Sequence, residues 1–181
     1  MLSPGEITAE FRRTVERENL LFSSLVASVA YGRTFRERFV GNPKYREPFT
    51  TVTTVGDVLF PISTWTAKDM DDLFEPYPAP LDLWVGQSWV MRVFSQWEEV
   101  TRPKLARTRG VQLHQIASDV MGDLRNIRND IVHHRAVASK DNCGRLKVLN
   151  DWVAVGYPIE VVHSHVADFL IKFEWEQIAR T

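Results

Sequence analysis

The residues of this chain best suited to chemistry lie together in residues 124–134, LRNIRNDIVHH. At the centre is an R-N-x-x-x-H string, formed by Arg128, Asn129 and His133. A histidine can transfer protons near neutral pH, and a fixed guanidinium donates two directed hydrogen bonds to the charge that develops on phosphate oxygens. The pair therefore suits metal-independent cleavage of RNA, in which the ribose 2′-hydroxyl attacks the neighbouring phosphate and DNA is left intact.

The positions around the string predict a helix over residues 111–134. An apolar stripe recurs at helical spacing; its members are Leu113, Ile116, Val120, Leu124, Ile127 and Ile131. Arg125, Asn129 and His133 follow one another in steps of four on a second face, with Asn126 beside them. His134 falls on the apolar side, so we expect it to be packed in the core or to cap the helix.

The asparagine and the single histidine set further expectations. Asn129 can orient either the histidine or the arginine. One helix supplies one arginine and one usable histidine, whereas a twofold dimer that joins two such helices would supply two of each in a positively charged cleft. We therefore expect a homodimer. The alternative to a catalytic role is a plain helix C-terminus, in which four side chains only complement the helix dipole: Arg128, His133, His134 and Arg135.

A short basic run, comprising Arg102, Lys104, Arg107 and Arg109, precedes the motif helix. Arg102 and Lys104 are candidate phosphate contacts, together with Arg125 and Asn126 from the motif helix. The alternative is a solvated helix end whose cations favour the dipole.

Other kinds of site find little support in the sequence. His133 and His134 are adjacent, so they diverge on a helix and cannot chelate one ion together. The lone Cys143 forms neither a zinc pattern nor an internal disulfide. No glycine-rich phosphate loop and no G-x-S-x-G elbow is present. We expect no metal and no cofactor.

The bulk composition is that of an ordinary globular protein. The chain has 181 residues with a formal net charge of −1, which argues against nonspecific coating of DNA. The single cysteine, the lack of a signal-peptide pattern and the lack of a long apolar run predict a cytoplasmic protein with no membrane span. The 6 tryptophans are interpreted as core or subunit-interface residues, with base stacking as the alternative.

Periodicity predicts an all-α fold, a helical bundle with four principal helices at residues 6–38, 82–105, 111–134 and 163–180. We expect Pro103 to end or kink the second helix and Ser164 to cap the fourth. A β-branched stretch around residues 49–62 predicts a small hairpin that turns at Gly56-Asp57. Thr66 is a candidate N-cap. Pro76, Pro78 and Pro80 mark a boundary inside a single domain, 1–181, between an N-terminal extension (1–80) and core helices (81–181).

In this context the chain resembles the HEPN superfamily of all-α domains, which carry an R-x(4–6)-H motif late in the third helix. Arg128, four residues and His133 match that motif, and Asn129 matches the polar residue often found after the arginine. Trp97-Glu98 followed by Arg102-Pro103 is similar to some prokaryotic members, and the turn at residues 156–159 before the last helix is compatible. The resemblance covers residues 81–181.

The resemblance implies a homodimeric, metal-independent endoribonuclease with a composite site, serving as a toxin or an antiviral, abortive-infection effector, with an antitoxin as a further partner. Arg128 and His133 carry over as catalytic residues and Asn129 as a supporting one. Two alternatives stay open. One is a noncatalytic HEPN-like module that binds RNA, a nucleotide or a protein; the other is a dimeric scaffold built on the tryptophan-rich stripe.

Overall fold

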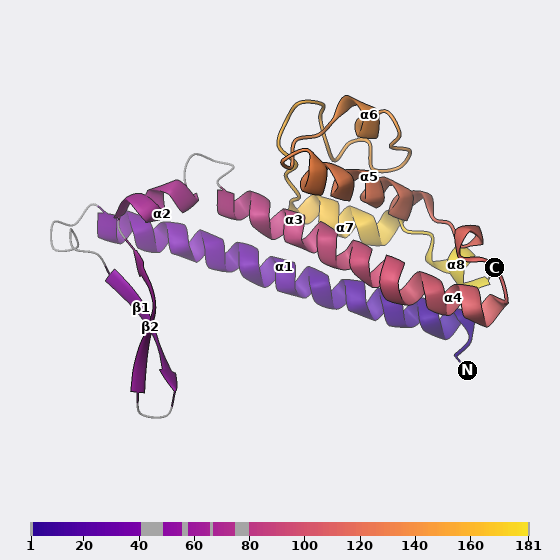
Figure 1. Cartoon of the computed structure of the whole chain (residues 1–181), viewed down its shortest axis with the longest axis horizontal. Coiled ribbons are helices and arrows are strands. Elements are labelled where there is room, and N and C mark those ends of the chain that lie inside the picture. Colours follow the sequence, from indigo (N-terminus) through magenta and orange to yellow (C-terminus); the bar gives the residue numbers. More distant parts are fainter. Residues whose placement is uncertain (1, 41–48, 56–57, 66, 75–79, 181) are drawn as a thin grey trace. The chain divides into compact units, whose positions relative to one another are not determined.

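Helices account for most of the chain in the computed structural model, which describes residues 2–40, 49–55, 58–65, 67–74 and 80–180 (Figure 1). The predicted all-α fold class is confirmed, whereas its HEPN-like arrangement stays a prediction. Contacts divide the chain into two compact units, residues 1–24 with 83–181, and residues 25–82. Among the described residues, no helix has both the length and the apolar character needed to cross a membrane.

Helix α1 (Pro4–Val40) agrees with the helix predicted at 6–38, and its first part belongs to the core of the larger unit. It lies antiparallel to the helical run that starts with α3 (Pro80–Ser95). The early residue Glu10 accepts a hydrogen bond from Lys104 at 3.0 Å, while the later Glu18 accepts one from Arg92 at 2.6 Å. The N-terminal residues are therefore built into this unit.

Aromatic rings from four segments form the centre of the larger unit. Phe11 of α1 lies 5.4 Å from both Trp97 and Phe173, measured between ring centroids. Trp89 contacts Phe169 at 5.4 Å and Trp152 at 6.2 Å. Trp89, Trp97 and Trp152 are buried, so the interpretation of these three tryptophans as core residues is confirmed.

The run after α3 does not end at Pro103, which was one of the two outcomes predicted there. It passes through a π-helical turn, η2 (Gln96–Thr101), into α4 (Arg102–Arg109). In an α-helix the proline ring clashes with the carbonyl four residues earlier and removes one hydrogen bond. In the wider π-turn the Arg102 N–H reaches back five residues to the Trp97 carbonyl, and the helix continues past the proline.

Two predicted helices are each broken in two. Residues 111–134 contain a 3₁₀ turn, η3 (Leu113–Gln115), and the helix α5 (Asp119–His133). Ser118 is extended and its hydroxyl accepts from the Met121 N–H, so α5 starts there. Residues 163–180 form α7 (His163–Lys172) and α8 (Trp175–Arg180). Val162 is the N-cap of α7, and the prediction of Ser164 in that role is wrong.

The smaller unit contains the second part of α1, a hairpin and α2 (Ala67–Phe74). The predicted hairpin is confirmed as the antiparallel strands β1 (Phe49–Val55) and β2 (Val58–Trp65), and an irregular register lets β2 continue through Pro61. The predicted turn at 56–57, the cap Thr66 and the prolines 76 and 78 lie outside the described residues.

Two aspartates of α5 hold the segment that follows this helix. Asp123 is 2% exposed, and its carboxylate accepts from the backbone N–H groups of Lys147, Val148 and Leu149 at 2.6–3.0 Å. Asp130, also buried, accepts from the Ser139 N–H at 2.8 Å and from the Asn142 amide. Both bonds to Asp130 come from the start of the short helix α6 (Lys140–Cys143). The segment is therefore fastened to α5 at two points.

We expect Asp123→Ala to lower the free energy of unfolding by about 3 kcal/mol, because it leaves three backbone N–H groups, that of Leu149 buried, without an acceptor. Urea titration followed by tryptophan fluorescence measures this loss. The matched control is Asp119→Ala on the same helix, where the carboxylate is exposed and, among the described residues, pairs only with the Lys147 ammonium. Equal losses in the two variants would contradict the structural role of Asp123.

Candidate functional site

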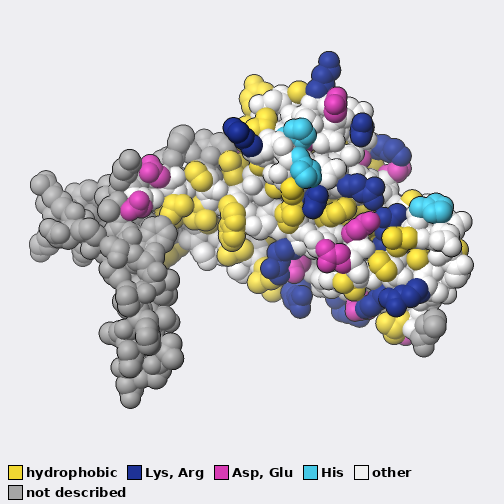
Figure 2. Space-filling view, viewed as in Figure 1, with side chains coloured by type: hydrophobic (Ala, Val, Ile, Leu, Met, Phe, Trp, Pro, Cys, Tyr) yellow, Lys and Arg dark blue, Asp and Glu magenta, His cyan; other side chains and the backbone are white. Residues whose placement is uncertain are grey.

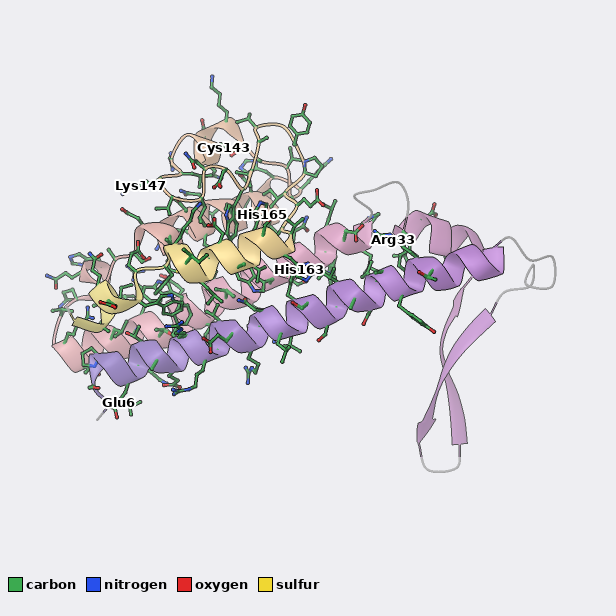
Figure 3. All side chains as sticks on the ribbon, turned by 180° about the vertical axis from the view of Figure 1, so that it is seen from behind. Glu6, Arg33, Cys143, Lys147, His163 and His165 are labelled. Carbon is green, nitrogen blue, oxygen red and sulfur yellow. The ribbon has the colours of Figure 1, made fainter. Side chains whose placement is uncertain are left out.

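Helix α5 carries the R-N-x-x-x-H string on its second half and turns its apolar stripe into the core. Val120, Leu124 and Ile127 are buried as predicted. Ile116 precedes the helix and is also buried, whereas Leu113, in η3, is exposed. Helices α5 and α7 lie side by side (Figures 1 and 3). The Ser118 hydroxyl donates to the Glu174 carboxylate at 2.7 Å and fixes the start of α5.

The outward face of α5 presents the motif side chains in a defined order. At 100° per residue, Arg128 and His133 lie roughly 140° apart, at opposite edges of this face. Arg125, Asn129 and the 45% exposed Val132 lie between these edges. The Arg128 guanidinium donates to the Asn129 side-chain oxygen at 3.3 Å. The asparagine thus orients the arginine, one of the two roles expected for it.

The two histidines differ from the expectation in one respect. His133 is exposed at the end of α5, and within the described part of the chain its imidazole has no hydrogen-bond partner. His134 is the C-cap residue, as one of the two expected roles requires. Its side chain is 54% exposed, with Nε2 3.8 Å from the Asp130 carboxylate, so the expectation of core packing is wrong. Figure 2 shows histidine, lysine and arginine side chains together on this part of the surface.

The basic residues before the motif are engaged inside the fold. Arg102 donates to both carboxylate oxygens of Glu98 at 2.8 and 3.0 Å, and to the Ile116 carbonyl at 2.9 Å. Lys104 is paired with Glu10. Arg125 is half-exposed, and its guanidinium lies 3.8 Å from Glu98. Of the predicted phosphate contacts, Arg125 and the half-buried Asn126 share the helix with the motif, and Arg102 and Lys104 have intramolecular partners.

The turn after the motif is strained. Arg135 and Ala136 have φ of 55° and 58°, in the left-handed region that side chains other than glycine disfavour. The Asp130 carbonyl accepts from the N–H of both His134 and Ala136, at 3.0 and 3.1 Å. These bonds reverse the chain directly after His133 and leave the side chains of His134 and Arg135 exposed. Strain of this kind is common at functional sites.

Cys143 and His165 lie near this region (Figure 3). Burial and the neighbouring Asp130 carboxylate raise the pKa of the Cys143 thiol, which keeps it protonated and unreactive. Burial lowers the pKa of His165, whose ring stacks on Trp152 at 4.9 Å. Within the described ranges, the side chains of histidine, cysteine, aspartate and glutamate form no group suited to a metal ion.

The sequence reasoning overlooked Asp123 and Asp130, although the signal was present. The two residues are seven positions apart and align with Val120 and Ile127 along the buried stripe. An acid repeated within an apolar stripe indicates a buried, hydrogen-bonded carboxylate.

Comparison with known protein families, curated proteins and solved structures finds no match to this chain.

We expect Ala136→Gly to raise the free energy of unfolding by about 0.5–1 kcal/mol, because glycine adopts the left-handed conformation without a Cβ clash. Denaturant titration measures the change. The control Ala167→Gly, at an exposed position within α7, should instead destabilise by about 1 kcal/mol. A loss of stability in Ala136→Gly would contradict the strain at this turn.

Proposed function

We propose that this protein is a metal-independent endoribonuclease whose active site forms at the interface of two copies of α5, with His133 and Arg128 as the catalytic residues. The observation that carries the proposal is the exposed imidazole of His133 on the same helical face as Arg128, whose guanidinium is oriented by Asn129. The resemblance to the HEPN superfamily supports the same reaction. RNA is the substrate.

His133 supplies the proton transfer. Its imidazole is exposed and has no hydrogen-bond partner among the described residues, so both ring nitrogens are open to a substrate. It removes the proton from the 2′-hydroxyl, or protonates the 5′-oxygen that leaves. The products are a 2′,3′-cyclic phosphate and a free 5′-hydroxyl. The 2′-hydroxyl is required, so DNA is not a substrate.

Arg128 supplies charge stabilisation. The hydrogen bond to Asn129 engages one nitrogen of the guanidinium, at 3.3 Å, and reduces the rotamer freedom of the side chain. Other N–H groups of the guanidinium remain to donate to the nonbridging oxygens of the phosphate as their charge grows in the transition state.

The angular separation of the two side chains supports a dimeric site. Residues roughly 140° apart on one helix diverge from the axis and do not converge on one phosphate. A twofold axis that brings two α5 helices together places Arg128 of one subunit opposite His133 of the other. Val132 lies between them and offers exposed apolar surface for that contact.

The biological setting follows the resemblance alone. HEPN ribonucleases of this kind act as toxins or as effectors of antiviral, abortive-infection systems, and we propose the same role here, with an antitoxin as the partner that restrains the enzyme. A cytoplasmic location fits an enzyme that acts on cellular RNA.

The purified protein should cleave single-stranded RNA in the presence of EDTA and leave cyclic phosphate ends. His133→Ala should slow cleavage by about 10²–10⁴-fold and Arg128→Ala by about 10²–10³-fold, with unfolding curves like that of the wild type. End analysis of the products and single-turnover rates measure these effects. Expression should arrest growth, and His133→Ala should relieve the arrest.

Two controls test the assignment. His134→Ala changes the adjacent exposed histidine, and His114→Ala changes an exposed histidine on η3. Both variants should cleave at the wild-type rate and unfold like the wild type. Normal cleavage by His133→Ala, or loss of cleavage in His134→Ala alone, would refute the site. Binding of RNA without cleavage by the wild type would favour the noncatalytic module.

The composite site can be tested by mixing the two inactive variants. Subunit exchange between Arg128→Ala and His133→Ala gives mixed dimers that hold one intact site, so about a quarter of the wild-type activity should return. Cleavage rates before and after exchange measure the recovery. Each variant exchanged with itself is the control. No recovery after exchange, verified by native mass spectrometry, would place both groups of a site in one subunit.

A further inference from the structure

Tyr157 stands out because its backbone is anchored while its ring is open to solvent. The side chain is 68% exposed, which is high for a large aromatic residue. Its carbonyl accepts from the Ala138 N–H at 2.9 Å, and its own N–H donates to the Ala154 carbonyl at 3.0 Å. A ring on a fixed backbone loses little freedom when it binds a flat partner.

The turn that carries Tyr157 is joined to the segment directly after the motif. Val137 pairs with Pro158 in an antiparallel bridge, and the Ile159 N–H donates to the Ala136 carbonyl at 2.8 Å. Gly156 adopts a φ of 83°, which an L side chain rarely does, and so allows the chain to turn here. The turn is therefore held beside residues 136–138, which follow the motif.

The inner side of this turn is fixed in the core. Ile159 is buried, and its carbonyl accepts from the Gln87 amide of α3 at 3.3 Å. Ala138, across the bridge, is buried as well. The anchoring explains why Tyr157 can remain exposed without leaving the turn loose.

The surroundings of Tyr157 have the composition of a nucleic-acid contact. Val137 and Val155 are exposed beside it and extend an apolar surface. Arg135, on the other side of the bridge, is exposed and can meet phosphate. An aromatic ring next to cationic side chains is the usual arrangement for binding single strands, in which bases stack and phosphates pair with the cations.

We infer that Tyr157 stacks on an unpaired nucleobase of the RNA next to the phosphate that is cleaved. This inference rests on the proposed function for the location of that phosphate. Bases in a duplex are stacked on each other and cannot reach the ring, so the residue selects single-stranded RNA. Apolar surface from Val137 and Val155 supports the ribose and base edge, and Arg135 meets a flanking phosphate.

Binding is measured without cleavage, in full-length protein that carries His133→Ala. Fluorescence anisotropy with a short labelled single-stranded RNA should show that Tyr157→Ala weakens binding by about tenfold or more. Tyr157→Phe keeps the ring and should bind within about twofold of the His133→Ala background, since stacking needs no hydroxyl. Binding to duplex RNA should not change.

Tyr31→Ala is the matched control, because Tyr31 is equally exposed but lies on α1 in the other unit. It should bind the single strand like the background protein. The inference is overturned if Tyr157→Ala binds single-stranded RNA like the background. It is also overturned if Tyr157→Ala changes the sedimentation of the protein, because the ring is then a subunit contact.

Cleavage is measured separately in protein that retains His133. This measurement separates the inference from the proposed function. Cleavage together with unchanged binding by Tyr157→Ala refutes the stacking role alone. Absence of cleavage together with Tyr157-dependent binding refutes the ribonuclease and supports the stacking role.

Discussion

The burial of two carboxylates along one line of α5 holds the segment 139–149, which follows this helix, against it. A carboxylate removed from water is costly unless hydrogen bonds replace its hydration, and the N–H groups of an irregular segment have the same need for acceptors. Asp123 and Asp130 satisfy both needs with the backbone of residues 139–149. Separating that segment from α5 would leave both the two carboxylates and the backbone N–H groups without their hydrogen-bond partners. The turn after His133 has no regular structure of its own, but the residues that follow it are held in place by hydrogen bonds to α5.

The motif therefore combines a buried, hydrogen-bonded side chain with side chains that face solvent. Asp130 stands inside the motif string, yet its side chain is a structural anchor, and its neighbours on the helix carry the polar surface. The string thus serves two purposes on two faces of one helix. The inward face holds the backbone that follows α5, and the turn that carries Tyr157 is bonded to this backbone. The outward face presents Arg128 and His133.

Periodicity was sufficient to predict the helical class, α1 and most of the buried stripe of α5, and the β-branched composition predicted the hairpin. It failed where the backbone leaves the uniform helix on which a wheel depends. Core packing was one of the two roles expected for His134 because the wheel was extended past His133, whereas His134 is the C-cap residue, with a φ of −119°, and lies outside the helix. The break before α5 is set by the Ser118 hydroxyl, a local bond that apolar spacing does not contain. The pairing of Arg102 and Lys104 depends on partners that only the folded chain brings near.

The π-turn before Pro103 explains one more feature of the sequence. Buried residues recur in steps of four through Val85, Trp89, Val93, Trp97, Thr101 and Leu105. On an ideal α-helix Leu105 would point roughly 160° away from Val85. The wide turn, which holds more residues per turn, offsets part of this drift. The register that it sets decides which side chains of this long run reach the core.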